Sequence, residues 1–184
     1  DSTWKEKNVI AIVDGKEILA VGDEAYAMFE RTPGNIEVVF PMKEGVISRF
    51  TDMQYLLQNL LKKERRFARG SEYLIAVPTD VTEVEKRAFF DLVVHSTAKA
   101  KEVSIVERGV AQCIGMGVDV RKTKGMLIAD FGAATTELSV VGSGGMVLNK
   151  MLKIGGMTFD VAVQNMVRRN YDFLIGRQTA EALR

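Results

Sequence analysis

The stretch of sequence that decides the fold is residues 125–141, which read GMLIADFGAATTELSVV. The two ends of this stretch are apolar runs with the length and the β-branched or large aliphatic content of strands. The centre holds an acid, Asp130, followed by small residues and by a pair of threonines. The small residues at 132–134 predict a tight turn in which another chemical group can approach the backbone closely.

The order of residue types around this turn suits a phosphate group and its metal ion. Backbone N–H groups and threonine hydroxyls bind phosphate oxygens, and a carboxylate at the end of a buried strand holds Mg²⁺ directly or through water. The same residues also fit an ordinary hairpin, in which Asp and Thr side chains make only local hydrogen bonds. This stretch alone leaves both interpretations open.

Composition limits the classes of protein that need to be considered. The chain has 184 residues, of which 47% are hydrophobic and 27% charged, and a formal net charge of +1. These values are ordinary for a globular chain with one core or two small ones, and they give no support for nucleic-acid binding. No apolar run reaches the ~20 residues of a membrane-spanning helix, and no signal peptide is recognised.

The cysteine and histidine content excludes several kinds of site. The single Cys113 excludes an internal disulfide and a cysteine zinc cluster, and it fits a reducing compartment. The single His95 excludes a site with several histidine ligands. We expect His95 on the surface of its helix and Cys113 in the core as a small apolar residue.

Periodicity and turn signals predict an alternation of strands and helices. Asp14-Gly15 is a strong hairpin signal because both turn positions favour positive φ. Thr51 is expected to cap a helix with a leucine stripe, and residues 73–77 are expected to form a buried strand. The alternation implies a mixed α/β sheet, with the best internal boundaries at residues 41–45 and 142–145. The predicted strands are 9–13, 16–21, 36–40, 73–77, 103–106 and three antiparallel strands between 126 and 154; the predicted helices are a short one from 23, then 51–63, 82–98, 107–116, 158–170 and 177–184.

Six segments in collinear order resemble one family of proteins. The sequence is similar throughout to the MreB family of bacterial actin-like, cell-shape-determining proteins, and more loosely to actin and the heat-shock chaperone ATPases. One such motif alone is weak, whereas six in order with sensible spacing are specific. The segments are RTPGNI (31–36), PMKEGVI (41–47), DFGAATTE (130–137), IGG with FD (154–160), VRRNY (167–171) and IG with TAE (175–181).

The resemblance implies an incomplete actin-like ATPase fold, which is an α/β fold of the ribonuclease H-like kind. Such a fold has two lobes, with ATP and Mg²⁺ in the cleft between them. Residues 1–42 would form the small outer subdomain of the first lobe, residues 43–143 its inner subdomain, and residues 144–184 the start of the inner subdomain of the second lobe. The first phosphate hairpin of the family and the rest of its second lobe have no counterpart in this sequence.

The resemblance also implies roles for individual residues of the site. Asp130 matches the acid that holds Mg²⁺, directly or through water, and is also a candidate catalytic residue. Glu181 and Arg184 match a Glu and a Lys around the adenosine ribose, and the Arg keeps the charge with a different hydrogen-bond geometry. Two glycines of the family's second phosphate loop are alanines here, which would be strained if their φ were positive. The residues that match the phosphate contacts are Gly132, Ala133, Ala134, Thr135, Thr136, Gly155 and Gly156.

A departure from the family pattern concerns hydrolysis. The family has two glutamates followed by proline where this chain has Glu107-Arg108-Gly109. The second glutamate lies near the water that attacks the γ-phosphate, and a guanidinium cannot accept a proton or a hydrogen bond at neutral pH. The resemblance therefore implies weak or lost hydrolysis, unless Glu107, roughly 100° round the helix, substitutes. ATPase activity is thus left open, with Glu107 as a candidate catalytic residue.

Two classes of function follow from the resemblance. The first is a filament-forming cytoskeletal protein, cytoplasmic and membrane-associated, that binds ATP and Mg²⁺ and controls cell shape and wall growth. Its partners would be further copies of itself and the membrane proteins of cell-wall elongation and division, without nucleic acid. The second is a degenerate relative that acts as a scaffold or interaction module and binds no nucleotide.

The basic loop at residues 62–70 contains one aromatic residue, Phe67. This loop matches the place where the family carries an apolar loop that touches the membrane. Phe67 would insert among lipid head groups while the arginines meet anionic lipid. The alternative is a solvated charge run without any membrane contact.

Overall fold

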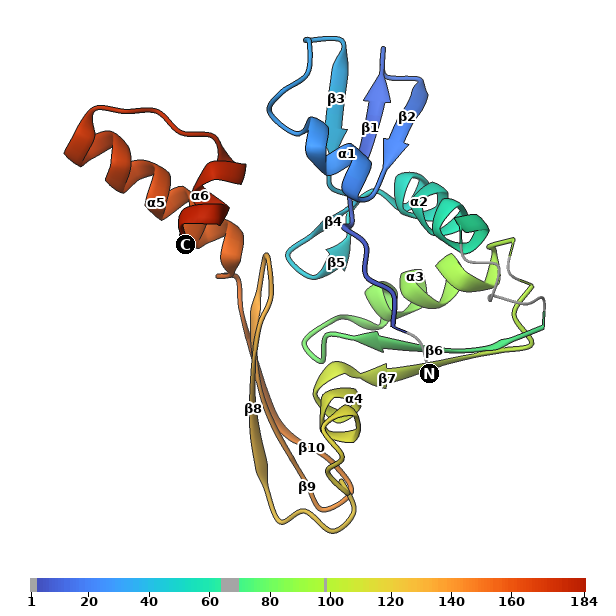
Figure 1. Cartoon of the computed structure of the whole chain (residues 1–184). Coiled ribbons are helices and arrows are strands. Elements are labelled where there is room, and N and C mark those ends of the chain that lie inside the picture. Colours follow the sequence, from blue (N-terminus) through green and yellow to red (C-terminus); the bar gives the residue numbers. More distant parts are fainter. Residues whose placement is uncertain (1–2, 64–69, 98) are drawn as a thin grey trace. The chain divides into compact units, whose positions relative to one another are not determined.

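The computed structural model describes residues 3–63, 70–97 and 99–184 (Figure 1). Contacts within the chain divide it into two compact units. The first unit contains Asp1–Tyr73 and Arg87–Ser104, and the second contains Leu74–Lys86 and Ile105–Arg184. Helices and strands alternate along the chain, which confirms the predicted α/β class. No helix in the described ranges is both long and apolar enough to cross a bilayer.

A three-stranded antiparallel sheet in the order β2-β1-β3 forms the centre of the first unit (Figure 1). The strands are β1 (Ile10–Val13), β2 (Glu17–Val21) and β3 (Ile36–Val39). Asp14 and Gly15 join β1 to β2 with φ angles of 50° and 66°, as the dipeptide predicts. Successive residues of β1 point to opposite faces of the sheet, so both faces carry apolar side chains.

Two helices cover the two faces of this sheet. α1 (Asp23–Met28) packs on one face through Ala25, and α2 (Phe50–Lys63) packs on the other through Leu56. The period of two along β1 therefore produces two separate apolar clusters. The α1 cluster contains Val9, Ala11 and Ala20, and the α2 cluster contains Ile10, Ile12, Val21 and Val39.

The start of α2 differs from the sequence prediction. A short hairpin, β4 (Met42–Lys43) and β5 (Val46–Ile47), precedes this helix. The Arg49 carbonyl accepts a hydrogen bond from the Met53 amide (3.0 Å), so the helix starts before Thr51. The prediction that Thr51 caps this helix is therefore wrong, because the backbone of Thr51 is already helical.

A two-stranded sheet pairs β6 (Glu72–Val77) with β7 (Glu102–Glu107), and α3 (Glu83–Val94) lies between them in the sequence. The prediction of a buried strand at 73–77 is wrong for one face, because Leu74 is 69% exposed and only Val77 is buried. The apolar run alone does not distinguish a strand covered on both faces from one covered on a single face. α3 also ends at Val94, earlier than the periodicity predicts.

The first turn of α3 is a capping box. The Glu85 carboxylate accepts hydrogen bonds from the Thr82 amide (2.7 Å) and the Thr82 hydroxyl (2.8 Å). These two bonds, the backbone bond most, lower the pKa of Glu85. In return, the Glu85 amide donates a hydrogen bond to the Thr82 hydroxyl (3.3 Å). The two residues thus satisfy amides that have no partner inside the helix, and the helix starts within one residue of the predicted position.

The second unit contains an antiparallel meander in the order β10-β9-β8, as predicted (Figure 1). Its strands are β8 (Met126–Phe131), β9 (Thr136–Gly142) and β10 (Gly145–Leu152). α4 (Arg108–Gly115) packs on this meander over a core of Cys113, Val120, Ile128 and Val141. After the meander, α5 (Gly156–Tyr171) and α6 (Arg177–Leu183) pack against each other. Cys113 is thus a core residue, and His95 in the first unit is exposed, both as expected.

Candidate functional site

The turn between β8 and β9 is the feature that the sequence predicts as a phosphate site. The Gly132 amide donates a hydrogen bond to the Thr135 carbonyl (2.9 Å), which closes the turn. Neither Ala133 nor Ala134 has a positive φ, so the two alanines cause no backbone strain. Within the described residues, the amides of Ala133 and Ala134 donate to no protein acceptor. Two adjacent free N–H groups on a turn of small residues are able to bind an anion.

The start of α5 lies against this turn. The amides of Gly156 and Met157 donate hydrogen bonds to the carbonyls of Gly132 (3.0 Å) and Ala133 (2.8 Å). A Cβ atom on Gly155 would lie 2.7 Å from the Gly132 oxygen and 2.8 Å from the Ala133 carbonyl carbon, where no real Cβ atom fits. Gly155 is therefore required by the close approach of two backbones. The first amides of α5 bind the turn and are not free for a ligand.

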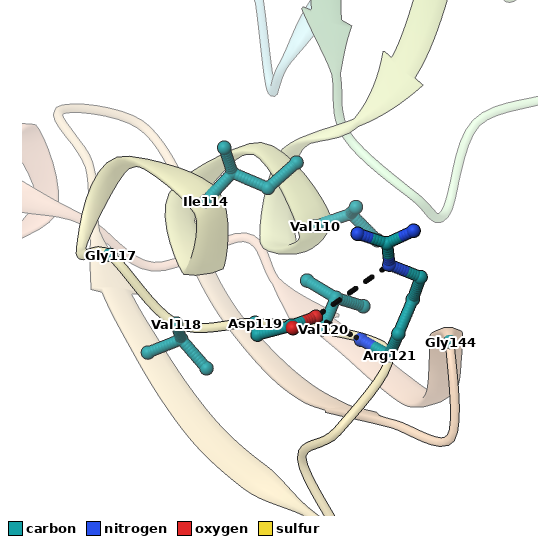
Figure 2. Close-up of a pocket in the computed structure, with 8 residues that line it drawn as sticks. All are labelled: Val110, Ile114, Gly117, Val118, Asp119, Val120, Arg121 and Gly144. Carbon is teal, nitrogen blue, oxygen red and sulfur yellow. Dashed lines mark hydrogen bonds and ion pairs between the residues drawn. The ribbon is translucent and has the colours of Figure 1, made fainter.

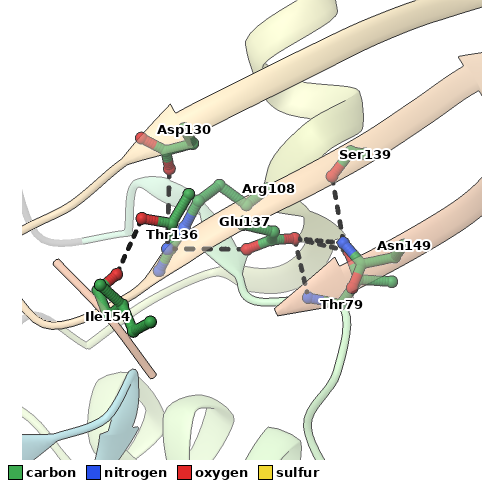
Figure 3. Close-up of polar contacts among 8 residues, drawn as sticks. All are labelled: Thr79, Arg108, Asp130, Thr136, Glu137, Ser139, Asn149 and Ile154. Atoms are coloured by element: carbon green, nitrogen blue, oxygen red, sulfur yellow. Dashed lines mark hydrogen bonds and ion pairs between the residues drawn. The ribbon is translucent and has the colours of Figure 1, made fainter. Parts of the chain in front are cut away.

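The paired threonines at the end of the turn are buried, each with 5% of its surface exposed. The Thr136 hydroxyl donates a hydrogen bond to the Ile154 carbonyl (2.8 Å), which connects β9 to the segment before α5 (Figure 3). The hydroxyl proton of Thr136 is thus used within the chain. Only the oxygen lone pairs of this residue remain for a ligand.

Arg108 lies between two carboxylates close to the turn (Figure 3). Its Nη1 atom is 3.8 Å from Asp130 Oδ2 and 3.7 Å from Glu137 Oε2, distances that make ion pairs without hydrogen bonds. Asp130 and Glu137 are directly opposite each other on β8 and β9, where two like charges repel. Arg108, the first residue of α4, offsets that repulsion. The sequence marks Arg108 as a departure from the family pattern but does not predict either ion pair.

Glu137 is almost completely buried, with 2% of its surface exposed. Its Oε1 atom accepts hydrogen bonds from the Thr79 hydroxyl (3.0 Å) and from the Asn149 side-chain amide (2.8 Å) (Figure 3). Its Oε2 atom accepts no hydrogen bond and faces Arg108. A carboxylate this deeply buried needs such partners, because removal from water disfavours the charged form. The sequence interpretation assigns no role to Glu137, although an acid within an otherwise apolar strand is a signal for one.

Glu107, the candidate catalytic glutamate, immediately precedes α4 with φ of −66° and ψ of 134°. The pKa of Lys86 is raised mainly by the hydrogen bond and ion pair of Lys86 with Glu83. The negative charge of Glu107 raises the same pKa to a smaller degree. Within the described residues, Glu107 makes no ion pair or hydrogen bond with the β8–β9 turn.

Gly109, which stands where the family has proline, lies at a close helix–strand contact. A Cβ atom on this residue would be 2.7 Å from both Cβ and Oγ of Ser139 and 2.8 Å from Cε of Met146. The absence of a side chain therefore lets the first turn of α4 approach β9. This approach also brings the neighbouring Arg108 to the carboxylates of β8 and β9.

Gly109→Ala is expected to lower the free energy of unfolding by about 1–3 kcal/mol, because the added methyl overpacks the contact with Ser139. Gly115→Ala, at the other end of the same helix, is the matched control, because its Cβ meets nothing within 4 Å. This control is expected to be neutral or stabilising, since alanine favours helix over glycine by up to about 1 kcal/mol. Urea unfolding followed by circular dichroism measures both changes. Equal effects of the two substitutions would contradict the contact.

The residues that match the family's ribose contacts lie at the end of the chain. Arg184 Nε donates a hydrogen bond to Oδ1 of Asp160 (2.7 Å), a carboxylate that is only 6% exposed. A Cβ atom on Gly156 would lie 2.9 Å from Nη2 of Arg184. Arg184 is thus fixed over the first residue of α5, which itself binds the turn. Glu181 is half-buried in α6. Phe67, the expected membrane contact, lies outside the described residues.

The donor set near the turn determines whether a nucleotide and its metal fit. Among the described residues, no group of three or more His, Cys, Asp or Glu side chains is able to hold a metal ion. Mg²⁺ needs only one or two carboxylates when phosphate oxygens supply other ligands, so Asp130 alone has suitable chemistry. However, the Arg108 cation lies 3.8 Å from Oδ2 of the same carboxylate and repels a divalent ion there. The residues present therefore fit a phosphate group but not its Mg²⁺ ion.

A separate pocket of about 500 Å³ lies between α4 and the loop 117–121 (Figure 2). α4 contributes Val110 and Ile114 to its lining. The Arg121 amide donates a hydrogen bond to Asp119 Oδ1 (3.0 Å), and Arg121 Nε lies 3.7 Å from the same oxygen. The two charged side chains of this pocket, Asp119 and Arg121, therefore pair with each other.

Known families provide an independent comparison. Residues 3–184 match the family model described as MreB/Mbl protein. The chain is 41% identical over 172 residues to the cell shape-determining protein MreB of Escherichia coli (strain K12), which covers 92% of this chain and 49% of that protein. It is 33% identical over 182 residues to the cell shape-determining protein Mbl of Bacillus subtilis (strain 168), which covers 97% of this chain and 54% of that protein. The chain therefore spans about half the length of the curated relatives it matches.

Solved structures with a similar fold lead to the same family. The crystal structure of MreB5 of Spiroplasma citri bound to ADP has a TM-score of 0.89 and 30% sequence identity, and the match covers 98% of this chain and 54% of that chain. The MamK double helical filament has a TM-score of 0.77 at 19% identity, which is a likeness of fold alone. These matches confirm the predicted actin-like fold in part of its length. The chain belongs to the MreB/Mbl family of actin-like proteins.

Proposed function

We propose that this chain is part of a filament-forming, cell-shape-determining protein that binds an adenine nucleotide through the turn between β8 and β9. The observation that carries the proposal is the pair of free amides at Ala133 and Ala134 on an unstrained turn. The relative MreB5 of Spiroplasma citri has been crystallised with ADP and with AMPPNP, which supports a nucleotide as the anion. The other positions that the resemblance gives as nucleotide contacts are Gly132, Thr135, Thr136, Gly155 and Gly156 at the phosphates and Glu181 and Arg184 at the ribose. The amides of Gly132 and Gly156 and the hydroxyl proton of Thr136 are already used within the chain, so these three groups are not proposed as donors.

Hydrolysis by this protein is proposed to be weak. Arg108 stands where the family has a glutamate that orients the attacking water, and its guanidinium has no acceptor atom. The nearest acids, Asp130 and Glu137, are paired with that same guanidinium. Phosphate release in the protein at its full natural length is expected to be slow and unchanged by Glu107→Ala.

The cellular role is proposed from the family alone. The three subdomains at residues 1–42, 43–143 and 144–184 would belong to a two-lobed molecule that polymerises with copies of itself on the cytoplasmic side of the membrane. Its filaments would act with the membrane proteins of cell-wall elongation and division to control wall growth. If Phe67 contacts the membrane, the Phe67→Ala variant is expected to bind liposomes more weakly than wild type.

A substitution in the turn tests nucleotide binding directly. Ala133→Glu places a negative charge beside the free amides and is expected to weaken ADP binding at least about tenfold, as measured with a fluorescent ADP analogue. Ala133 is exposed, so the fold tolerates the larger side chain. Ala133→Gly, which removes the methyl, is the control and is expected to keep the wild-type affinity. Equal ADP binding by Ala133→Glu and wild type would overturn the proposed site.

A scaffold that binds no nucleotide is the second candidate, and the paired state of Asp130 favours it, because this acid is already neutralised. Sedimentation of the protein in the presence and absence of ADP and ATP separates the two candidates. Filaments that form equally without nucleotide, together with no measurable ADP binding, would support the scaffold. Filaments whose amount depends on nucleotide would exclude it.

A further inference from the structure

We infer that Arg108 is a built-in counter-cation for the phosphate group, so that nucleotide binding to this protein depends little on a divalent metal ion. This inference rests on the proposed nucleotide site at the β8–β9 turn. It concerns the cation that neutralises the phosphate rather than the turn that binds it. The starting observation is that the position beside Asp130, where a metal ion would be held, is next to a guanidinium.

The charges around Arg108 are unequal. Two carboxylates, on Asp130 and Glu137, lie within 4 Å of one guanidinium nitrogen, at 3.8 Å and 3.7 Å. A divalent ion at Asp130 would gain the attraction of these carboxylates but would be repelled by the Arg108 guanidinium. The resident cation therefore lowers the affinity of this carboxylate for Mg²⁺.

The N–H donors of Arg108 are not used by the protein. Both of its carboxylate partners lie beyond hydrogen-bond distance, and within the described residues no acceptor takes a hydrogen bond from its guanidinium. Its side chain keeps 26% of its surface exposed, so solvent and ligands reach it. A planar guanidinium with free donors matches the oxygens of a phosphate group, which it binds through two parallel hydrogen bonds.

The position of Arg108 is fixed by its surroundings. Glu137, which attracts the guanidinium, is itself held by hydrogen bonds from Thr79 (3.0 Å) and Asn149 (2.8 Å). Gly109 lets the first turn of α4 approach Ser139 closely, because any side chain at 109 would meet it at 2.7 Å. Gly109 therefore permits the close approach of α4 to β9, and this approach brings the Arg108 guanidinium to the carboxylates of Asp130 and Glu137.

The affinity for a fluorescent ADP analogue, measured on the protein at its full natural length in Mg²⁺ and in EDTA, tests this inference. Wild type is expected to lose less than about threefold in affinity when EDTA replaces Mg²⁺. Arg108→Gln is expected to lose at least about tenfold in EDTA and to regain affinity in Mg²⁺, because Asp130 is then free to hold the ion. Arg108→Lys keeps the charge but not the two parallel N–H donors, so its affinity in EDTA is expected to lie between those of wild type and Arg108→Gln.

A second readout is thermal stability in the presence of ADP. Mg²⁺ is expected to raise the unfolding midpoint of ADP-bound Arg108→Gln but not that of ADP-bound wild type, because an ion that binds only the folded state stabilises it. Arg121→Gln, which removes a surface cation from the separate pocket beside α4, is the matched control and is expected to behave as wild type in both measurements.

The outcomes separate this inference from the proposed function. Binding by wild type that disappears in EDTA would overturn the counter-cation role and leave the nucleotide site intact. Unchanged EDTA affinity in Arg108→Gln would overturn it in the same way. Absence of ADP binding by wild type in both buffers would overturn the nucleotide site and the inference together.

Discussion

Gly155→Ala is expected to destabilise the second unit by about 3 kcal/mol, the larger of the two glycine effects. The added Cβ would stand 2.7 Å from the carbonyl oxygen of Gly132 and 2.8 Å from the carbonyl carbon of Ala133. Both are backbone atoms, so no side-chain rotation relieves the overlap, and the turn must separate from α5. The hydrogen bonds of Gly156 and Met157 to the turn would lengthen or break as a result. Urea unfolding of wild type and variant measures the loss.

Gly145→Ala is the matched control for this prediction. Gly145 begins β10 in the same unit, has no positive φ, and a Cβ atom on it would meet nothing within 4 Å. This substitution is expected to change the free energy of unfolding by less than about 0.5 kcal/mol. If Gly155→Ala proved as mild as Gly145→Ala, the contact between the turn and α5 would not exist as described.

Glu137→Ala is expected to cost about 3 kcal/mol of unfolding free energy. The substitution removes the acceptor of the Thr79 hydroxyl and one of the two acceptors of the Asn149 side-chain amide, and it removes one carboxylate partner of Arg108. Thermal and urea unfolding of the variant measure the cost. Because Glu137 is 2% exposed, water does not readily replace the lost partners.

Glu137→Gln separates the hydrogen bonds from the charge. Its side-chain oxygen still accepts from Thr79 and Asn149, whereas its amide group faces Arg108 without attraction. The loss of unfolding free energy is therefore expected to be about half that of Glu137→Ala. Similar losses for both variants would mean that the ion pair with Arg108, rather than the hydrogen bonds, carries the stability.

Local signals in the sequence predicted the elements well. The hairpin at Asp14-Gly15 follows from two residues that adopt positive φ, and the structure has both. The meander follows from apolar runs separated by turn residues within a stretch of the chain. Helix ends were less predictable: Thr51 resembles a cap in type, yet the helix starts at Phe50 because a backbone carbonyl accepts the first amide.

The candidate site was predicted in its backbone but not in its electrostatics. The turn at 132–134 follows from small residues next to one another in the sequence. The partners of Glu137 do not, because Thr79 lies 58 positions away and meets it only after the strands are assembled. The pairing of Arg108 with Asp130 requires the same assembly, and it depends on the space that Gly109 leaves. No local pattern encodes such contacts between distant residues.

Because Cys113 is buried and is the single cysteine of the sequence, it is useful for labelling experiments. This residue carries the sole thiol of the sequence and has no exposed surface in the native core. A maleimide dye therefore reacts with it only when the packing beneath α4 opens, so the labelling rate reports that opening without any mutation. For the same reason, a cysteine introduced at an exposed position takes up a dye selectively in the native state, which gives direct access to fluorescence measurements of assembly.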